Sequence, residues 1–228
     1  MKSGITCRDL CYAVPAASSE NCLVLDNCNA VFPSGRVSII SGDVGAGKSC
    51  LLHILAGLIR PTSGQVTANG QAVSRWTGTH RDRWRCEIGI IFQHYHLLTD
   101  YTVLENVMLP LVPLGLKLSE CRRRGIEALQ QTAILHLAGS SVNSLSGGER
   151  QKTSVARALV TRPAFIFADE PTAHQDAENA ERVMDLLNAC AGRNAVVIVA
   201  THDPGMEALA ENPVPFRLVD SKLEMSAG

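Results

Sequence analysis

No stretch of the 228-residue sequence is apolar for long enough to cross a membrane. A spanning helix needs about 20 consecutive apolar residues, whereas the most apolar segment, Val103 to Leu118, is interrupted by charged residues and prolines. The first residues, 1–19, carry Arg8 and Asp9 where a secretory signal would have an apolar core, so we expect no such signal. If the protein acts at a membrane, a partner must supply the spanning helices.

An extended basic block is also missing, because 21 Lys and Arg residues are balanced by 22 Asp and Glu residues. A protein that binds nucleic acid without sequence preference presents a basic face, so we expect no nucleic-acid partner. None of the eight cysteines forms a C-x-x-C pair or a Cys/His cluster with zinc spacing. We therefore predict free thiols, most of them buried.

What the sequence does contain is a balanced globular composition, 46% hydrophobic and 19% charged, and a length that suits one large α/β domain. Its most informative stretch is a glycine-rich octapeptide between two apolar runs, with the sequence Gly42, Asp43, Val44, Gly45, Ala46, Gly47, Lys48 and Ser49. This spacing fits the phosphate-binding loop G-x-x-x-x-G-K-[ST] between a strand and a helix.

Each part of this loop has a physical task in binding a nucleotide. The glycines let main-chain N–H groups surround phosphate oxygens, and the N-terminus of the next helix adds partial positive charge. Lys48 can reach the β- and γ-phosphates, and the Ser49 hydroxyl can bind Mg²⁺. The alternative is a tight turn that contains a lysine by chance, which the flanking apolar runs disfavour.

Two further apolar strands end in polar residues. Asp169 and Glu170 follow the run 165–168, and His202 follows the run 196–200. Open α/β sheets bind ligands at the carboxyl ends of their strands, where a carboxylate can hold Mg²⁺ and its neighbour can orient an attacking water. An acidic loop without ligand, and a histidine of the core or surface, are the simpler alternatives.

Ser146 and Glu149 have the spacing of a capping box, which predicts a helix from there to about Val160. Gly147 and Gly148 leave the first N–H groups of this helix open, which favours a second anion-binding terminus. A capped helix that binds nothing remains the alternative.

The other elements are predicted by their ranges: strands at 5–14, 23–32 and 88–92, helices at 48–58 and within 99–138, a helix at 177–191 capped by Gly192, a segment at 65–68 before a hairpin turn at Asn69 and Gly70, and a hairpin within 213–228. Residues 74–87 interleave arginines with Trp76 and Trp84. A solvated helix packed by its tryptophans is favoured there over a nucleic-acid surface.

In this order the motifs resemble the nucleotide-binding subunit of ATP-binding cassette (ABC) transporters. The resemblance covers essentially the whole chain, and the segment LSGGE at 145–149 is its most specific part. It implies an α/β fold of the P-loop NTPase class with a parallel core sheet, an antiparallel β subdomain and a helical subdomain. We expect one ATP-binding domain over 1–228, with its core at 1–92 and 160–228 and the helical subdomain at 93–159.

The resemblance also implies roles for individual residues, with ATP and Mg²⁺ as ligands. The nucleotide would contact the loop and its neighbour Cys50 in one subunit, and the signature and D-loop residues of a second subunit, Ser146, Gly147, Gly148 and Asp176. Ser49, Gln93 and Asp169 would hold the metal. Glu170, His202, Lys48 and Gln93 would act in catalysis. The intact motif set favours a homodimer that binds ATP head to tail.

A finer match lies in residues 92–98 and 100–107, which resemble the lipoprotein-releasing and macrolide-exporter ATPases. This implies a peripheral protein on the cytoplasmic face of the inner membrane, docked on an integral membrane subunit and driving export or extraction of a lipoprotein, peptide or drug-like substrate. The alternative is a mechanical or regulatory ATPase of the cell-division type. Soluble repair or translation ATPases of this family need tandem cassettes or a coiled-coil insertion, which the sequence lacks.

Three departures from the family pattern stand out. Cys50 replaces a threonine beside the nucleotide, so we expect its alkylation to inhibit unless ATP protects it. Residues 173–175 depart from the usual sequence before the D-loop aspartate. The aromatic residue that stacks on adenine is either Tyr12 in a shifted register or is replaced by an aliphatic surface at Val14.

Overall fold

The computed structural model describes residues 4–15, 22–73, 78–173 and 176–226. Its elements follow one another as β1 (Gly4–Val14), β2 (Cys22–Pro33), β3 (Val37–Ser41), α1 (Lys48–Leu55), β4 (Ser63–Ala68), β5 (Gln71–Ala72), α2 (Gly78–Glu87), β6 (Ile88–Ile91), α3 (Val103–Met108), η2 (Leu109–Leu114), α4 (Leu118–Gln131), η3 (Leu135–Leu137), η4 (Val142–Ser144), α5 (Gly147–Leu159), β7 (Phe165–Asp169), α6 (Ala177–Gly192), β8 (Val196–Ala200), α7 (Met206–Leu209), β9 (Val214–Val219) and β10 (Lys222–Met225).

The core sheet has the strand order β10-β9-β3-β8-β7-β6. Its five strands from β9 to β6 are parallel, and β10 closes the edge as the antiparallel partner of β9. Every residue of β7 and β8 is buried, as expected for parallel strands that are covered on both faces. The predicted apolar strands at 165–168 and 196–200 are therefore confirmed.

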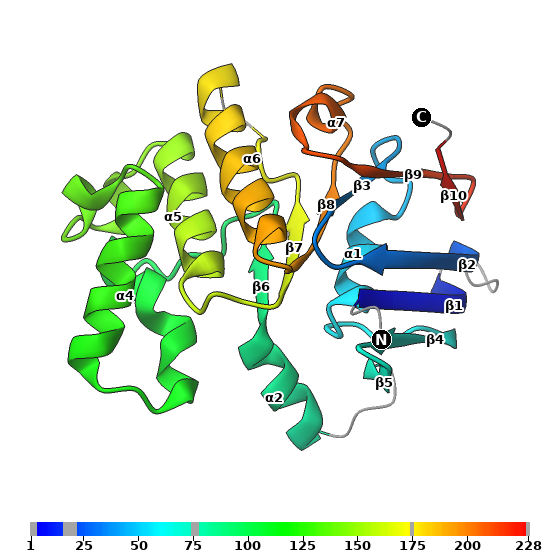
Figure 1. Ribbon diagram of the computed structural model, residues 1–228, viewed down its shortest axis with the longest axis horizontal. Coiled ribbons are helices and arrows are strands. Elements are labelled where there is room, and N and C mark those ends of the chain that lie inside the picture. Colours follow the sequence, from blue (N-terminus) through cyan, green and yellow to red (C-terminus); the bar gives the residue numbers. More distant parts are fainter. Residues whose placement is uncertain (1–3, 16–21, 74–77, 174–175, 227–228) are drawn as a thin grey trace.

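A second, antiparallel sheet with the order β2-β1-β4-β5 lies beside the core sheet (Figure 1). Helix α1 packs between the two sheets, and its leucines share one apolar cluster with Ile5 of β1 and Phe167 of β7. Strands β4 and β5 are joined at Asn69 and Gly70, whose φ angles are 49° and 82°. Two consecutive positive φ values suit a two-residue hairpin turn, which confirms the predicted turn.

The opposite face of the core sheet is covered by α5 and α6, which bury Val155, Val183 and Leu187 against β3, β7 and β8. Helices α3, α4 and α5 with η2 form a third cluster around Val107, Leu111 and Leu129, and they occupy the left side of Figure 1. The bounds of 93–159 for a helical subdomain remain a prediction.

Three predicted boundaries are wrong, the one at the end of α6 by a single residue. Helix α1 ends at Leu55 rather than 58, because Gly57 adopts a φ of 73° that is incompatible with a continuing helix. Helix α6 includes Gly192, and Arg193 is its C-cap. Within 99–138 the chain begins helical structure only at Val103, and a prolyl 3₁₀ segment, η2, separates α3 from α4.

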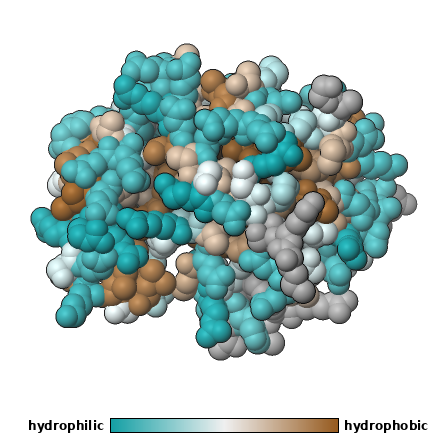
Figure 2. Space-filling model, in the orientation of Figure 1, coloured by the Kyte–Doolittle hydropathy of each residue, from teal (hydrophilic) through white to brown (hydrophobic). Residues whose placement is uncertain are grey.

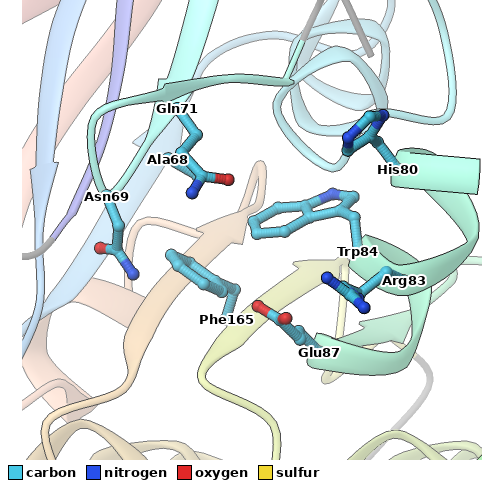
Figure 3. A pocket seen from close by; sticks show the side chains of 8 residues that line it. All are labelled: Ala68, Asn69, Gln71, His80, Arg83, Trp84, Glu87 and Phe165. Atoms are coloured by element: carbon cyan, nitrogen blue, oxygen red, sulfur yellow. The ribbon is translucent and has the colours of Figure 1, made fainter. Parts of the chain in front are cut away.

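Helix α2 packs through Trp84, which is 3% exposed. The centroid of its ring lies 4.6 Å from that of Phe165, and its indole N–H donates a 2.7 Å hydrogen bond to the Ala56 carbonyl. Figure 3 shows both rings beside a cavity of about 250 Å³, whose rim carries Arg83 and Glu87 of the same helix. A buried indole cannot stack on a nucleic-acid base, so Trp84 serves packing as predicted. Trp76 lies outside the described residues.

All eight cysteines lie within the described residues and are free thiols, as predicted. Only half of them, Cys7, Cys28, Cys121 and Cys190, are buried, rather than most as expected. Among the described residues, none of the helices has both the length and the apolar character that a bilayer crossing requires.

Candidate active site

The phosphate loop connects β3 to α1, and its glycines are required by close packing. Gly42 has a φ of 151°, and a Cβ placed on it would lie 2.5 Å from the Leu218 carbonyl oxygen. Gly47 has a φ of 100°, and a Cβ there would lie 2.9 Å from the Val24 side chain. Because L side chains rarely adopt these angles, the predicted loop conformation depends on glycine at both positions.

Lys48 begins α1 and is 6% exposed. Its ammonium group donates hydrogen bonds of 2.7 Å to the Gly42 carbonyl and 2.9 Å to the Asp43 carbonyl. The charge is therefore held on the inner side of its own loop, next to the N–H groups of the first helical turn. A buried cation and open N–H groups together suit a multiply charged phosphate.

Asp169 ends β7 at the same edge of the sheet. Its carboxyl group is buried, and the oxygen Oδ1 has no hydrogen-bond partner among the described residues. The pKa of Asp169 is raised above its usual value, chiefly by burial. A hydrogen bond from the Ser49 hydroxyl and the nearby charges of His53 and Lys48 act in the opposite direction. The structure thus brings the predicted metal residues Ser49 and Asp169 into contact and leaves one carboxylate oxygen available.

Glu170 follows Asp169 in a left-handed backbone conformation, with a φ of 47°. Its oxygen Oε1 accepts a 2.9 Å hydrogen bond from the His202 main-chain N–H and lies 2.7 Å from His202 Nδ1. The Thr201 hydroxyl donates a 3.0 Å hydrogen bond to the other oxygen, Oε2. Both carboxylate oxygens are therefore held from the end of β8, and the two residues predicted separately, Glu170 and His202, are in direct contact.

Thr201 is the residue that sequence reasoning missed. It is fully buried, and besides binding Glu170 it accepts a 3.0 Å hydrogen bond from the Asp203 N–H. The available signal was a hydroxyl residue at the carboxyl end of an apolar strand, between Ala200 and the predicted histidine.

Gln93 lies two residues beyond the end of β6, which is Ile91 rather than Phe92. Because Ile91 pairs with Ala168 in parallel register, Gln93 emerges beside the strand end that carries Asp169. Phe92 packs between the rings of His53 and His96, with centroids at 5.8 and 5.1 Å. Burial lowers the pKa of His53.

The signature residues lie elsewhere. Ser146 and Glu149 form the predicted capping box: the Glu149 carboxylate accepts from the Ser146 N–H at 2.7 Å, and the Ser146 hydroxyl accepts from the Glu149 N–H at 3.4 Å. In Figure 1, α5 lies to the left of β7 and α1 to its right. The start of α5 therefore lies apart from the phosphate loop of its own chain.

Asp176, Cys50 and Tyr12 complete the predicted set. Asp176 caps α6 by accepting a 2.8 Å hydrogen bond from the Asn179 N–H, and the preceding residues 174–175 lie outside the described residues. Cys50 is half-buried, and both burial and the Asp169 charge raise its pKa. Register irregularities flank Tyr12, which packs partly against the core; the choice between Tyr12 and Val14 stays a prediction.

Residues 25–173 match the family model described as ABC transporter. The chain belongs to the ABC transporter family. It is 38% identical over 197 residues to the lipoprotein-releasing system ATP-binding protein LolD of Psychrobacter arcticus, covering 85% of this chain and 87% of the relative. The corresponding protein of Pseudoalteromonas translucida is 37% identical over 201 residues, covering 87% and 86%.

Among solved structures, the ABC cassette MJ0796, a dimer in a post-hydrolysis state bound to ADP and Pi, superposes with a TM-score of 0.90 at 30% identity, covering 98% of this chain and 99% of that one. The fold is that of the P-loop ATPases of ABC transporters, as expected. The chain is a nucleotide-binding, ATP-hydrolysing subunit of such a transporter.

Proposed function

We propose that this ATPase powers the extraction or export of lipoproteins through a separate integral membrane subunit, working as a dimer on the cytoplasmic face of the inner membrane. The similarity to lipoprotein-releasing ATP-binding proteins over most of the chain supports the substrate class. The dimeric state of the similar cassette supports the assembly.

The observation that carries the catalytic part is the convergence of strand ends. Lys48, Asp169, Glu170 and His202 meet at the carboxyl edge of β3, β7 and β8. Glu170 would orient and polarise the attacking water, since both its oxygens are held in a fixed direction. Lys48 and the N-terminus of α1 would stabilise the charge on the γ-phosphate, and His202 would contact that phosphate once ATP is bound.

Mg²⁺ fits the residues at this edge. A hydroxyl and a carboxylate are the hard oxygen ligands that Mg²⁺ prefers, and the buried Asp169 Oδ1 has no partner among the described residues. We assign Ser49, Asp169 and Gln93 as the groups that hold the ion or its waters. When bound, Mg²⁺ would neutralise charge on the β- and γ-phosphates.

The second half of each site would come from a second copy of the chain. The start of α5, at Ser146, Gly147 and Gly148, is a helix N-terminus that would suit a phosphate but lies apart from the loop of its own chain. A head-to-tail pair would place this terminus over the γ-phosphate of the partner's ATP, with Asp176 near the contact. Residues 93–159 would then move together as a helical subdomain.

The membrane subunit is proposed to dock at the groove between β6, η2 and α5. This groove has a volume of about 250 Å³ and is lined by Phe92, Pro110 and Arg157. Val112 and Leu118, which follow Pro110 along the chain, are 69% and 75% exposed. Figure 2 shows hydrophobic surface at the lower left, over this end of the helices. An apolar helix of the membrane partner fits this combination.

A double substitution tests this contact. Val112→Glu with Leu118→Glu should prevent co-purification with the membrane subunit, because charged groups would be buried without partners, while ATPase activity of the isolated chain stays near that of the unmodified protein. The matched control is Leu23→Glu, at an exposed apolar position of the antiparallel sheet. Unchanged co-purification of the double variant would reject the contact.

The substrate class is tested by reconstitution. The chain and its membrane subunit, placed in proteoliposomes that contain a lipoprotein, should release the lipoprotein when ATP is added and not when Glu170 is replaced by Gln. ATP hydrolysis by the complex without any release would reject lipoprotein extraction and favour the mechanical alternative.

A further inference from the structure

Arg157 of α5 contacts the segment that follows Gln93. Its guanidinium donates hydrogen bonds of 2.5 Å to the Tyr95 carbonyl and 2.7 Å to the His96 carbonyl. Both acceptors are main-chain atoms, and they belong to consecutive residues. A planar guanidinium that binds two neighbouring carbonyls fixes the path of that backbone in two directions.

The position of this cation is costly without such partners. Burial lowers the pKa of Arg157 from its ordinary value, yet a guanidinium stays charged in proteins at neutral pH. A desolvated charge needs strong hydrogen bonds to offset its lost hydration, and the two carbonyls provide them. Removing the guanidinium therefore frees the backbone it binds and also leaves the two carbonyls without this donor.

The other end of the same segment is fixed as well. Asn106 of α3 is fully buried; its side-chain oxygen accepts a 2.8 Å hydrogen bond from the Leu98 N–H, and its amide donates a 3.0 Å bond to the Leu98 carbonyl. The residues from Tyr95 to Leu98 are thus attached to helices at both ends. Gln93 is exposed, but its main chain is confined between the last residue of β6 and the fixed Tyr95.

We propose that Arg157 is a positioning residue for Gln93, holding the segment after Gln93 on α5 so that Gln93 stays beside the strand end that carries Asp169. This inference rests on the proposed role of Gln93 as a metal or water contact. Arg157 would act through the main chain that it binds, rather than by contact with nucleotide or metal.

Helix α5 contacts the site at a second point as well. Its buried residue Gln151 donates a 2.5 Å hydrogen bond to the carbonyl of Pro171, the residue after Glu170. The helix that begins at the signature motif therefore holds both the segment after Gln93 and the segment after Glu170. A tilt of α5 would displace Gln93 relative to Asp169.

The experiment compares four single variants of the purified full chain: Arg157→Met, Arg157→Lys, Gln93→Ala as the reference for the direct role, and Lys152→Met as the control. Lys152 lies on the same helix but contributes to a surface with Asn179 and Arg182 of α6. Two quantities are measured: the Mg²⁺ concentration for half-maximal ATPase activity, and amide hydrogen exchange in residues 93–98 without nucleotide.

In Arg157→Met we expect a Mg²⁺ requirement raised by about tenfold and a lower kcat, the range seen when groups that orient metal ligands are removed. The KM for ATP should change little, because the phosphate loop is untouched. Exchange in residues 93–98 should become faster. Arg157→Lys should lie between Arg157→Met and the unmodified chain, since an ammonium group reaches one carbonyl well but not two. Lys152→Met should match the unmodified chain.

The outcomes separate the two claims. If Gln93→Ala raises the Mg²⁺ requirement but both Arg157 variants behave as Lys152→Met does, the positioning role is overturned while the role of Gln93 stands. If Gln93→Ala leaves the Mg²⁺ requirement unchanged, the proposed role of Gln93 fails and the inference fails with it. Should Arg157→Met not fold, Arg157→Lys decides by the same two measurements.

Discussion

The two helix termini that we propose to bind phosphate are built in different ways. At α1, Lys48 donates a hydrogen bond to its own loop, and the neighbouring Asp169 and Glu170 are held by hydroxyl groups of the same chain. At α5, the capping box fixes the helix start, and this start lies away from that site. Under the proposed mechanism, one half of the site is preassembled within one chain, whereas the other half would come from a second subunit.

The largest effect is expected at the preassembled half. Glu170→Gln keeps the side-chain shape but loses the negative charge that polarises water, so ATP turnover should fall by at least about 100-fold. ATP binding should persist, because Lys48 and the loop are unchanged. A stable dimer should then accumulate in the presence of ATP, because the bound ATP is not hydrolysed. Turnover assays, nucleotide binding and light scattering check these points; full turnover would remove Glu170 from its role.

Substitution of Thr201 should have a smaller and more specific effect on kcat. Thr201→Val preserves volume but removes the hydroxyl that holds Glu170 Oε2, so kcat should drop by about tenfold through misorientation of the carboxylate. The KM for ATP should stay within about twofold, and Thr201→Ser should recover most of the activity. A kcat equal to that of the unmodified chain in Thr201→Val would mean that the hydroxyl does not position Glu170.

The alkylation rate of Cys50 measures how accessible the half of the site around α1 is to solvent. Because burial and the Asp169 charge raise its pKa, less thiolate is present at neutral pH, and alkylation should be slower than at the exposed Cys22. The rate should rise as the pH increases, ATP should protect, and modification should inhibit. Mass spectrometry with a Cys50→Ser control measures this. Unchanged activity after stoichiometric labelling would reject the placement of Cys50 beside the nucleotide.

The sequence predicted the parts whose physics is local. The loop glycines, the capping box at Ser146 and the buried strands are each specified by neighbouring residues, and the structure has them where expected. The ends of α1 and of the helices after Val103 were less predictable, because they depend on Gly57 packing near Trp84 and on prolines within an apolar stretch.

Contacts between residues far apart in the chain could not be predicted from the sequence. Thr201 and Glu170 are 31 positions apart, and Arg157 and His96 are 61 positions apart. No periodicity or spacing relates such pairs, since their contact is created by strand order and by the packing of α5 on the segment after β6. The candidate site was therefore predictable as a set of residue types at strand ends, but the groups that orient those residues were not.

The composite nature of the site is the central claim, and mixed dimers test it most directly. One variant carries Lys48→Ala. The other carries Gly147→Asp, which fits its own chain because a Cβ there lies 3.8 Å from the Tyr95 hydroxyl, but which places a carboxylate against phosphate. Each variant alone should be inactive.

In a head-to-tail dimer, the mixed species retains one site with an intact loop and an intact signature helix. Mixing equal amounts should therefore restore ATPase activity to about a quarter of that of the unmodified protein, as random pairing of the two chains requires. If each site were built within a single chain, every site in the mixture would carry a lesion. The absence of any restored activity, with mixed dimers shown to form, would contradict the account.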